Sequence, residues 1–81
     1  MNFTELSFVT VPQMWEERSE IFKAKSLDMS DIKKIDSAGI SFLVQWAKAL
    51  PEKRLKLANV PENALNLIST YKVNALFDIE E

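Results

Sequence analysis

The chain lacks two residue types that carry much of the chemistry of small proteins. Its 81 residues include no cysteine and no histidine. The absence of cysteine excludes disulfides and thiol nucleophiles. The absence of histidine removes serine–histidine–aspartate catalysis, the commonest zinc ligand and the usual pH switch. Any catalysis would have to depend on carboxylates, lysines and hydroxyls, so we expect a non-enzymatic binding protein with no metal site and no cofactor.

Long apolar runs and a strong charge bias are also missing. No apolar run approaches the roughly 20 residues that span a bilayer, and the acidic N-terminal region does not resemble a signal peptide. Ten basic against twelve acidic residues give a formal net charge of −2, which leaves no basic footprint for nucleic acid. We therefore expect a cytoplasmic protein with no nucleic-acid partner and no direct membrane insertion.

The residues that are present predict one small α/β domain covering residues 1–81. Hydrophobic residues make up 47% of the chain, which suits a globular core. Apolar alternation predicts strands at residues 2–6, 26–30 and 53–59, and the apolar tail at 73–79 can add a fourth; residues 31–35 are predicted to be a connection. With three main helices between these strands, we expect a mixed or parallel sheet of three to four strands packed against helices.

Helical periodicity accounts for the rest of the chain. The first helix is predicted over residues 11–25, with Thr10 as a possible cap and Pro12 in its first turn. The central helix begins at Ser37, ends before Pro51 and has its apolar residues at Ile40, Leu43, Val44, Ala47 and Leu50. Pro61 opens the third helix, whose expected apolar face consists of Ala64, Leu67, Ile68 and Tyr71.

The start of the central helix is the most informative stretch. It holds the only glycine of the chain, Gly39, and a glycine within a helix costs about 1 kcal/mol relative to alanine. Close backbone packing or the approach of a partner can offset that cost. Ser37 is predicted to cap the helix, with Asp36 beside the positive end of the helix dipole. Because Ala38 and Gly39 are small, we also expect a partner to reach the Ser37 hydroxyl.

The two tryptophans are predicted to have different roles. Trp15 lies at the border of the apolar face of the first helix, and two interpretations stay open: a half-buried flank of the core or an anchor for a partner. Trp46 shares a helical face with Phe42 and Leu50, so we expect it in the core.

Residues 27–43 resemble the signature of STAS domains. In that family a strand of the type apolar–Asp–apolar–Ser, here Leu27 to Ser30, is followed by Asp-Ser/Thr-x-Gly at the start of a long helix, here Asp36 to Gly39. The segment at residues 55–61, followed by an apolar helix, extends the resemblance. Relative to the family pattern the chain is short at its N-terminus, with room for one strand where a hairpin is usual.

Within the STAS family the chain is most similar to the small cytoplasmic subunit of the bacterial ABC transporter that moves phospholipid to maintain outer-membrane lipid asymmetry. Residues 14–18, Met-Trp-Glu-Glu-Arg, favour this branch. The resemblance implies an accessory subunit that docks on the transporter's ATPase, and through it on the membrane permease. The implied docking residues are Ser37, Trp15, Ala38, Gly39, Asp36 and Ser41.

Two other functions stay open. In the anti-sigma factor antagonist branch of the family, the serine that matches Ser37 is phosphorylated by a partner kinase, so Ser37 is a possible phosphorylation site here. A carboxylate-based enzyme or small-ligand binder could pair Asp28 with Asp36, but nothing in the sequence supplies a third partner for such chemistry.

Overall fold

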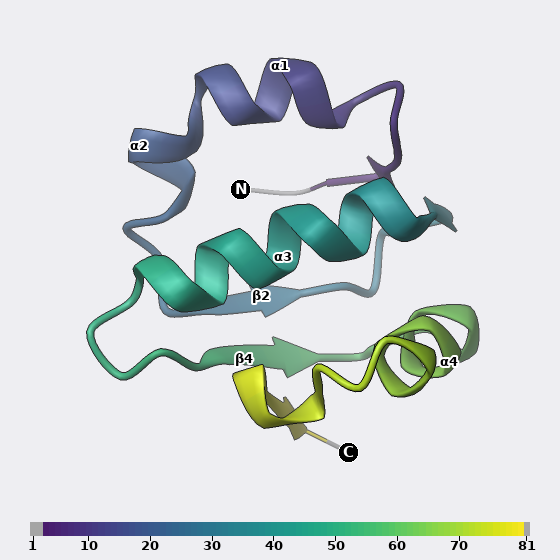
Figure 1. The fold of residues 1–81 in the computed structure, drawn as a ribbon. Helices are drawn as coiled ribbons and strands as arrows, with labels where there is room; N and C mark the ends of the chain where they lie inside the picture. Colours follow the sequence, from purple (N-terminus) through teal and green to yellow (C-terminus); the bar gives the residue numbers. More distant parts are fainter. Residues whose placement is uncertain (1–2, 81) are drawn as a thin grey trace.

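The computed structural model describes residues 3–80 of the chain. It confirms a small α/β fold in which strands alternate with helices (Figure 1). Along the chain the elements are β1 (Glu5–Leu6), α1 (Val11–Glu16), α2 (Arg18–Ile21), β2 (Ser26–Asp28), β3 (Lys34–Ile35), α3 (Ser37–Ala49), β4 (Leu55–Ala58), α4 (Glu62–Thr70), the 3-10 helix η1 (Asn74–Leu76) and β5 (Phe77–Glu80).

The described strands form two groups, and every pair in them is parallel. β2, β4 and β5 form a three-stranded sheet with β4 in the centre, and β1 pairs with β3. Of the two expected arrangements, mixed or parallel, the described strands adopt the parallel one, because each paired strand is joined to its neighbour through a connection that contains a helix. In Figure 1, α3 runs back across the molecule, with α1 and α2 on one side of it and β2 and β4 on the other.

The three-stranded sheet has one buried and one exposed face. Its inward side chains include Leu27, Leu57 and Phe77, which belong to the core. The alternate side chains, such as Lys56 and Asp78, are exposed. Parallel sheets are usually covered on both faces, so the polar alternation is what allows this sheet to leave one face to water.

The central helix forms as its sequence predicts. α3 begins at Ser37 and ends at Ala49, just before Pro51, because the residue before a proline disfavours helical geometry. Its inward side buries the residues Ile40, Phe42, Leu43, Trp46 and Ala47. The core position expected for Trp46 is confirmed, and its indole N–H donates to the carbonyl oxygen of Ala24 at 2.9 Å.

The single helix predicted for residues 11–25 is wrong, because the helix breaks at Glu17 and ends at Ile21. At the break, the Glu17 N–H bonds to the Met14 carbonyl oxygen at 3.1 Å, a tight three-residue turn. The Arg18 guanidinium then donates to the Trp15 carbonyl oxygen at 2.9 Å. The Trp15 carbonyl oxygen thus accepts from the Arg18 side chain in addition to a backbone N–H at the end of α1.

Three smaller expectations also need correction. Thr10 precedes α1 but does not cap it, because its hydroxyl accepts from the Ser7 N–H at 3.1 Å instead. The first strand covers only Glu5–Leu6 of the expected residues 2–6, of which Asn2 lies outside the described residues. The predicted connection at residues 31–35 contains β3, which pairs with β1.

Candidate functional site

The N-terminus of α3 is capped by Asp36 and not, as predicted, by Ser37. One Asp36 carboxylate oxygen accepts from the Gly39 N–H at 3.1 Å, and Ser37 is the first helical residue. Both residue types are good caps. The choice follows from the backbone, because Asp36 is extended and ends the link from β3, whereas Ser37 has already entered the helix. The Ser37 hydroxyl is consequently presented on the exposed surface.

The second carboxylate oxygen of Asp36 holds the turn between β1 and α1. It accepts from the Phe8 N–H at 3.1 Å. Burial raises the pKa of Asp36, but hydrogen bonds from the backbone of Phe8, Gly39 and Ala38, together with the positive charge of Lys34, lower the pKa below its ordinary value of 3.8 overall. Asp36 therefore acts as a charged clamp that joins two loops at one end of the molecule.

The turn that Asp36 holds carries the most exposed large apolar side chains of the described residues. Phe8 is 70% exposed and Val9 is 63% exposed. The turn is well fixed, because the Thr10 N–H bonds to the Ser7 carbonyl oxygen at 3.0 Å and the Val9 N–H bonds to the Ser7 hydroxyl at 3.2 Å. Sequence reasoning missed this pair. The available signal was two adjacent apolar residues in a turn, where no periodicity predicts burial.

Gly39 is needed for close packing between α3 and β1. The residue is buried, and a Cβ atom at this position would lie 2.1 Å from the Leu6 carbonyl oxygen. Of the two explanations for this glycine, the structure supports close backbone packing. Gly39 itself is buried, so its lack of a side chain serves this packing; that its small size also leaves the surface near Ser37 open to a partner stays a prediction.

The exposed face of α3 borders a groove. Ser37 and Ser41 are exposed, while Ala38 is half-buried. A groove of about 360 Å³ runs beside this face, and its other wall comes from Tyr71 and Val73 after α4. Tyr71, expected on the inward face of its helix, is 50% exposed, because α4 ends at Thr70 and Tyr71 lies beyond its regular turns.

Trp15 is 39% exposed, so it is a half-buried flank of the core that keeps a free surface. Its inner edge packs against Phe22 with ring centroids 6.3 Å apart, and Phe22 in turn contacts Phe42 of α3. The Arg18 guanidinium lies 4.3 Å from the centroid of the Trp15 ring, a cation–π contact. The Trp15 ring therefore contacts α3 indirectly, through Phe22 and then Phe42. This contact does not involve Ser37.

The two carboxylates considered for acid–base chemistry occupy separate turns. Asp28 accepts from the Asn59 side chain at 3.0 Å and from the Ser30 N–H at 2.9 Å, and these hydrogen bonds lower its pKa from the ordinary 3.8. The pKa of Asp36 is lowered as well. Two carboxyls that both stay ionised near neutral pH do not supply the protonated partner that a general acid requires.

The fold and this end of α3 define a class: small parallel α/β domains that expose a serine at the start of a helix held against the first strand. Residues 4–78 match the family described as "Mlab, STAS domain". The chain belongs to this family, as its Asp-Ser-Ala-Gly stretch predicts. No curated protein and no solved structure matches the chain.

No helix within residues 3–80 has the length and apolar character needed to cross a membrane.

Proposed function

We propose that this protein is a non-enzymatic accessory subunit that binds the cytoplasmic ATPase of an ABC-type phospholipid transporter and supports its assembly and activity. The family supports this proposal, because its description names the Mlab type of STAS domain. In this proposal the protein acts at the cytoplasmic side of the inner membrane and reaches the permease only through the ATPase.

The exposed start of α3 is the observation that carries the proposal. Asp36 takes over the capping, so the Ser37 hydroxyl is free to face a partner beside Ser41 and Ala38. Phe8 and Val9 add apolar area at the same end of the molecule, on a turn tied to Asp36. A preformed patch of this kind needs little ordering when it binds, which favours affinity.

Trp15 provides a second contact in the proposed interface. Tryptophan and arginine are enriched among residues that dominate binding energy, and here Arg18 holds the exposed Trp15 ring in place. We propose that the ATPase covers both the start of α3 and this Trp15–Arg18 pair.

Substitution of Ser37 tests the proposal. The protein is co-expressed with the ATPase subunit of the same transporter, and the affinity of the purified pair is measured by titration. Ser37→Glu is expected to weaken binding by at least about tenfold, because an unpaired carboxylate is costly in an interface. Trp15→Ala is expected to weaken binding by about tenfold, as for other aromatic anchors.

Ser26→Glu is the matched control, because Ser26 is exposed at the start of β2 and lies beside Leu50 and Pro51, which follow the end of α3 opposite to Ser37. It should bind normally, and all variants should keep the circular dichroism of the folded protein. Normal binding by both Ser37→Glu and Trp15→Ala would show that the interface is misplaced. Recovery of a serine kinase in place of the ATPase, with phosphate on Ser37, would instead favour the anti-sigma factor antagonist function.

A further inference from the structure

A separate cavity lies beyond the C-terminal end of α3. It has a volume of about 480 Å³, and its walls come from Lys25 before β2, the loop between α3 and β4, Lys56 of β4 and Asp78 of β5. Lys56 and Asp78 are paired in the register of β4 and β5, so the cavity opens on one end of the exposed sheet face. A volume of this size lies within the range of small-molecule sites.

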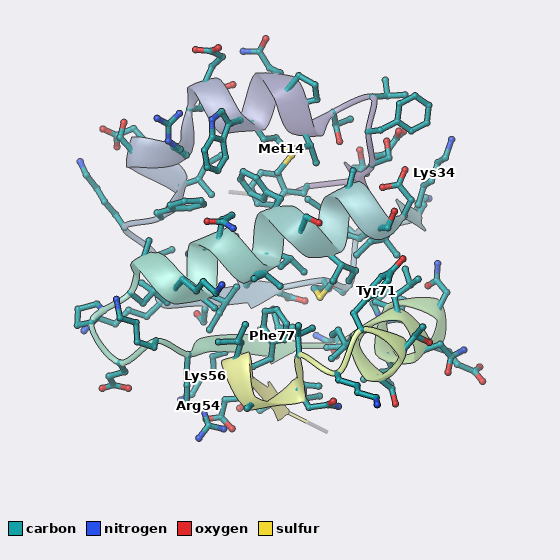
Figure 2. The ribbon with its side chains drawn as sticks, in the orientation of Figure 1. Met14, Lys34, Arg54, Lys56, Tyr71 and Phe77 are labelled. Carbon is teal, nitrogen blue, oxygen red and sulfur yellow. The ribbon has the colours of Figure 1, made fainter. Side chains whose placement is uncertain are left out.

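Cationic side chains outnumber carboxylates around this cavity. Lys25, Arg54 and Lys56 line it, together with Glu52 and Asp78. The Lys56 N–H donates to the Lys25 carbonyl oxygen at 3.2 Å, which sets the two lysines on neighbouring segments. Figure 2 shows Arg54 and Lys56 at the same end of the molecule. The cavity therefore has a positive balance of charge, although the formal net charge of the chain is −2.

The protein itself neutralises little of this positive charge. Among residues 3–80, neither Lys25 nor Lys56 forms an ion pair within 4.0 Å. Arg54 meets Asp78 at 4.0 Å, and the two side chains are 55% and 61% exposed. An ion pair this exposed is weak, and a guanidinium has five N–H donors. Arg54 thus keeps donors available for an anion from outside the protein.

We propose that this cavity binds a molecule with a single phosphate group, whose oxygens are held by Arg54, Lys56 and Lys25. A guanidinium can donate two parallel hydrogen bonds to a phosphate, and lysines add point charges. Three cations against Glu52 and Asp78 leave a balance of +1, which favours one phosphate over a diphosphate, because juxtaposed like charges are costly. A soluble phosphate ester and a phospholipid headgroup both offer this chemistry.

Titration with glycerol phosphate, followed by amide NMR of the whole protein, tests the site. We expect saturable shifts of the Lys25, Arg54 and Lys56 amide signals, and no tighter binding of pyrophosphate. Arg54→Gln and Lys56→Gln should each weaken binding by at least about fivefold, because each removes a charge-assisted hydrogen bond. Both side chains are exposed, so the variants should stay folded, and the same NMR spectra check this.

Lys34→Gln is the matched control, because it removes the same charge from another exposed strand lysine. Figure 2 places Lys34 at the opposite end of the molecule from Lys56. This variant should change the affinity for glycerol phosphate less than about twofold, because salt screens charges that are more than about 10 Å apart.

Co-sedimentation with phosphatidylglycerol vesicles separates the two sources of phosphate. Sedimentation that Lys56→Gln abolishes would assign the cavity to a lipid headgroup, whereas binding of glycerol phosphate without sedimentation would assign it to a soluble ester. The proposal is overturned if neither probe binds, if the NMR shifts lie away from the cavity, if pyrophosphate binds more tightly, or if Lys34→Gln weakens binding as much as Lys56→Gln. Failure to bind the ATPase would overturn the proposed function alone, because the cavity and Ser37 lie at opposite ends of α3.

Discussion

At the scale of single residues, one contact decides how α3 meets β1. The Leu6 backbone occupies the place that a side chain at position 39 would need, so the helix lies closer to the strand than any residue other than glycine allows. This contact brings the β1–α1 turn next to the Asp36 carboxylate. The position of Phe8 in the proposed interface thus depends on a residue that has no side chain.

Gly39→Ala tests this contact, because its two expected effects change the free energy of unfolding in opposite directions. Helix propensity alone would stabilise the protein by about 1 kcal/mol. The clash with Leu6 should instead destabilise it by about 2–3 kcal/mol, as overpacking in a core does. Urea unfolding followed by circular dichroism measures the difference. A gain in the free energy of unfolding would mean that α3 and β1 can separate at little cost.

At the scale of elements, the sequence predicted those that rest on periodicity. α3 and β4 were found because their apolar positions repeat without interruption, and α4 was found because Pro61 marks its start. β3 was missed because it has two residues and exists only through its pairing with β1. The break at Glu17 was missed as well, because continuous helical spacing hides a local turn that Trp15 and Arg18 stabilise.

The candidate site was predicted in its location but not in its details. The Asp-Ser-Ala-Gly stretch marks the exposed start of α3. Two adjacent cap residues, however, look equivalent in sequence, and only the extended backbone of Asp36 decides between them. The contributions of Phe8 and Tyr71 depend on which residues the fold brings beside α3. Those are tertiary facts that no local pattern contains.

The Asp36 clamp makes the attachment of α3 depend on pH. Its folded-state pKa is lowered from 3.8, so its contribution to stability is complete above that value and is lost as the pH falls through the lowered pKa. Asp36→Asn can still cap the helix but cannot ionise. We expect the variant to lose less stability than the natural protein when thermal unfolding is compared at pH 5 and at about pH 2.5. Equal losses of thermal stability in the two proteins would show that the charge of Asp36 does not contribute to the stability of the folded state.

At the scale of the whole molecule, stability comes from one small core. The buried residues of α3 contact strands on one side and α1–α2 on the other, and Figure 2 shows Met14 directed from α1 toward α3. A domain of this size buries only about 60–65% of the surface of its unfolded chain. The loss of a single central side chain can therefore remove most of its stability.

Two neighbouring substitutions test this dependence. Ile40 is 2% exposed, and Ile40→Asp should destabilise the domain by about 4 kcal/mol or more, because an unpaired carboxylate is buried. Ser41 is exposed on the same helix turn, and Ser41→Asp should change stability by less than about 0.5 kcal/mol. Thermal unfolding followed by circular dichroism compares the two. A folded Ile40→Asp variant would show that the core tolerates far more rearrangement than its packing indicates.

The different surroundings of the two tryptophans give this protein a pair of built-in optical reporters. Trp46 is buried with its indole N–H bonded to Ala24, whereas the Trp15 ring lies half open to water. A soluble quencher such as acrylamide reaches Trp15 alone in the folded protein, and a partner that covers Trp15 removes that quenching. Unfolding exposes Trp46 and moves its emission to longer wavelength. Fluorescence can therefore distinguish docking from loss of structure without any label.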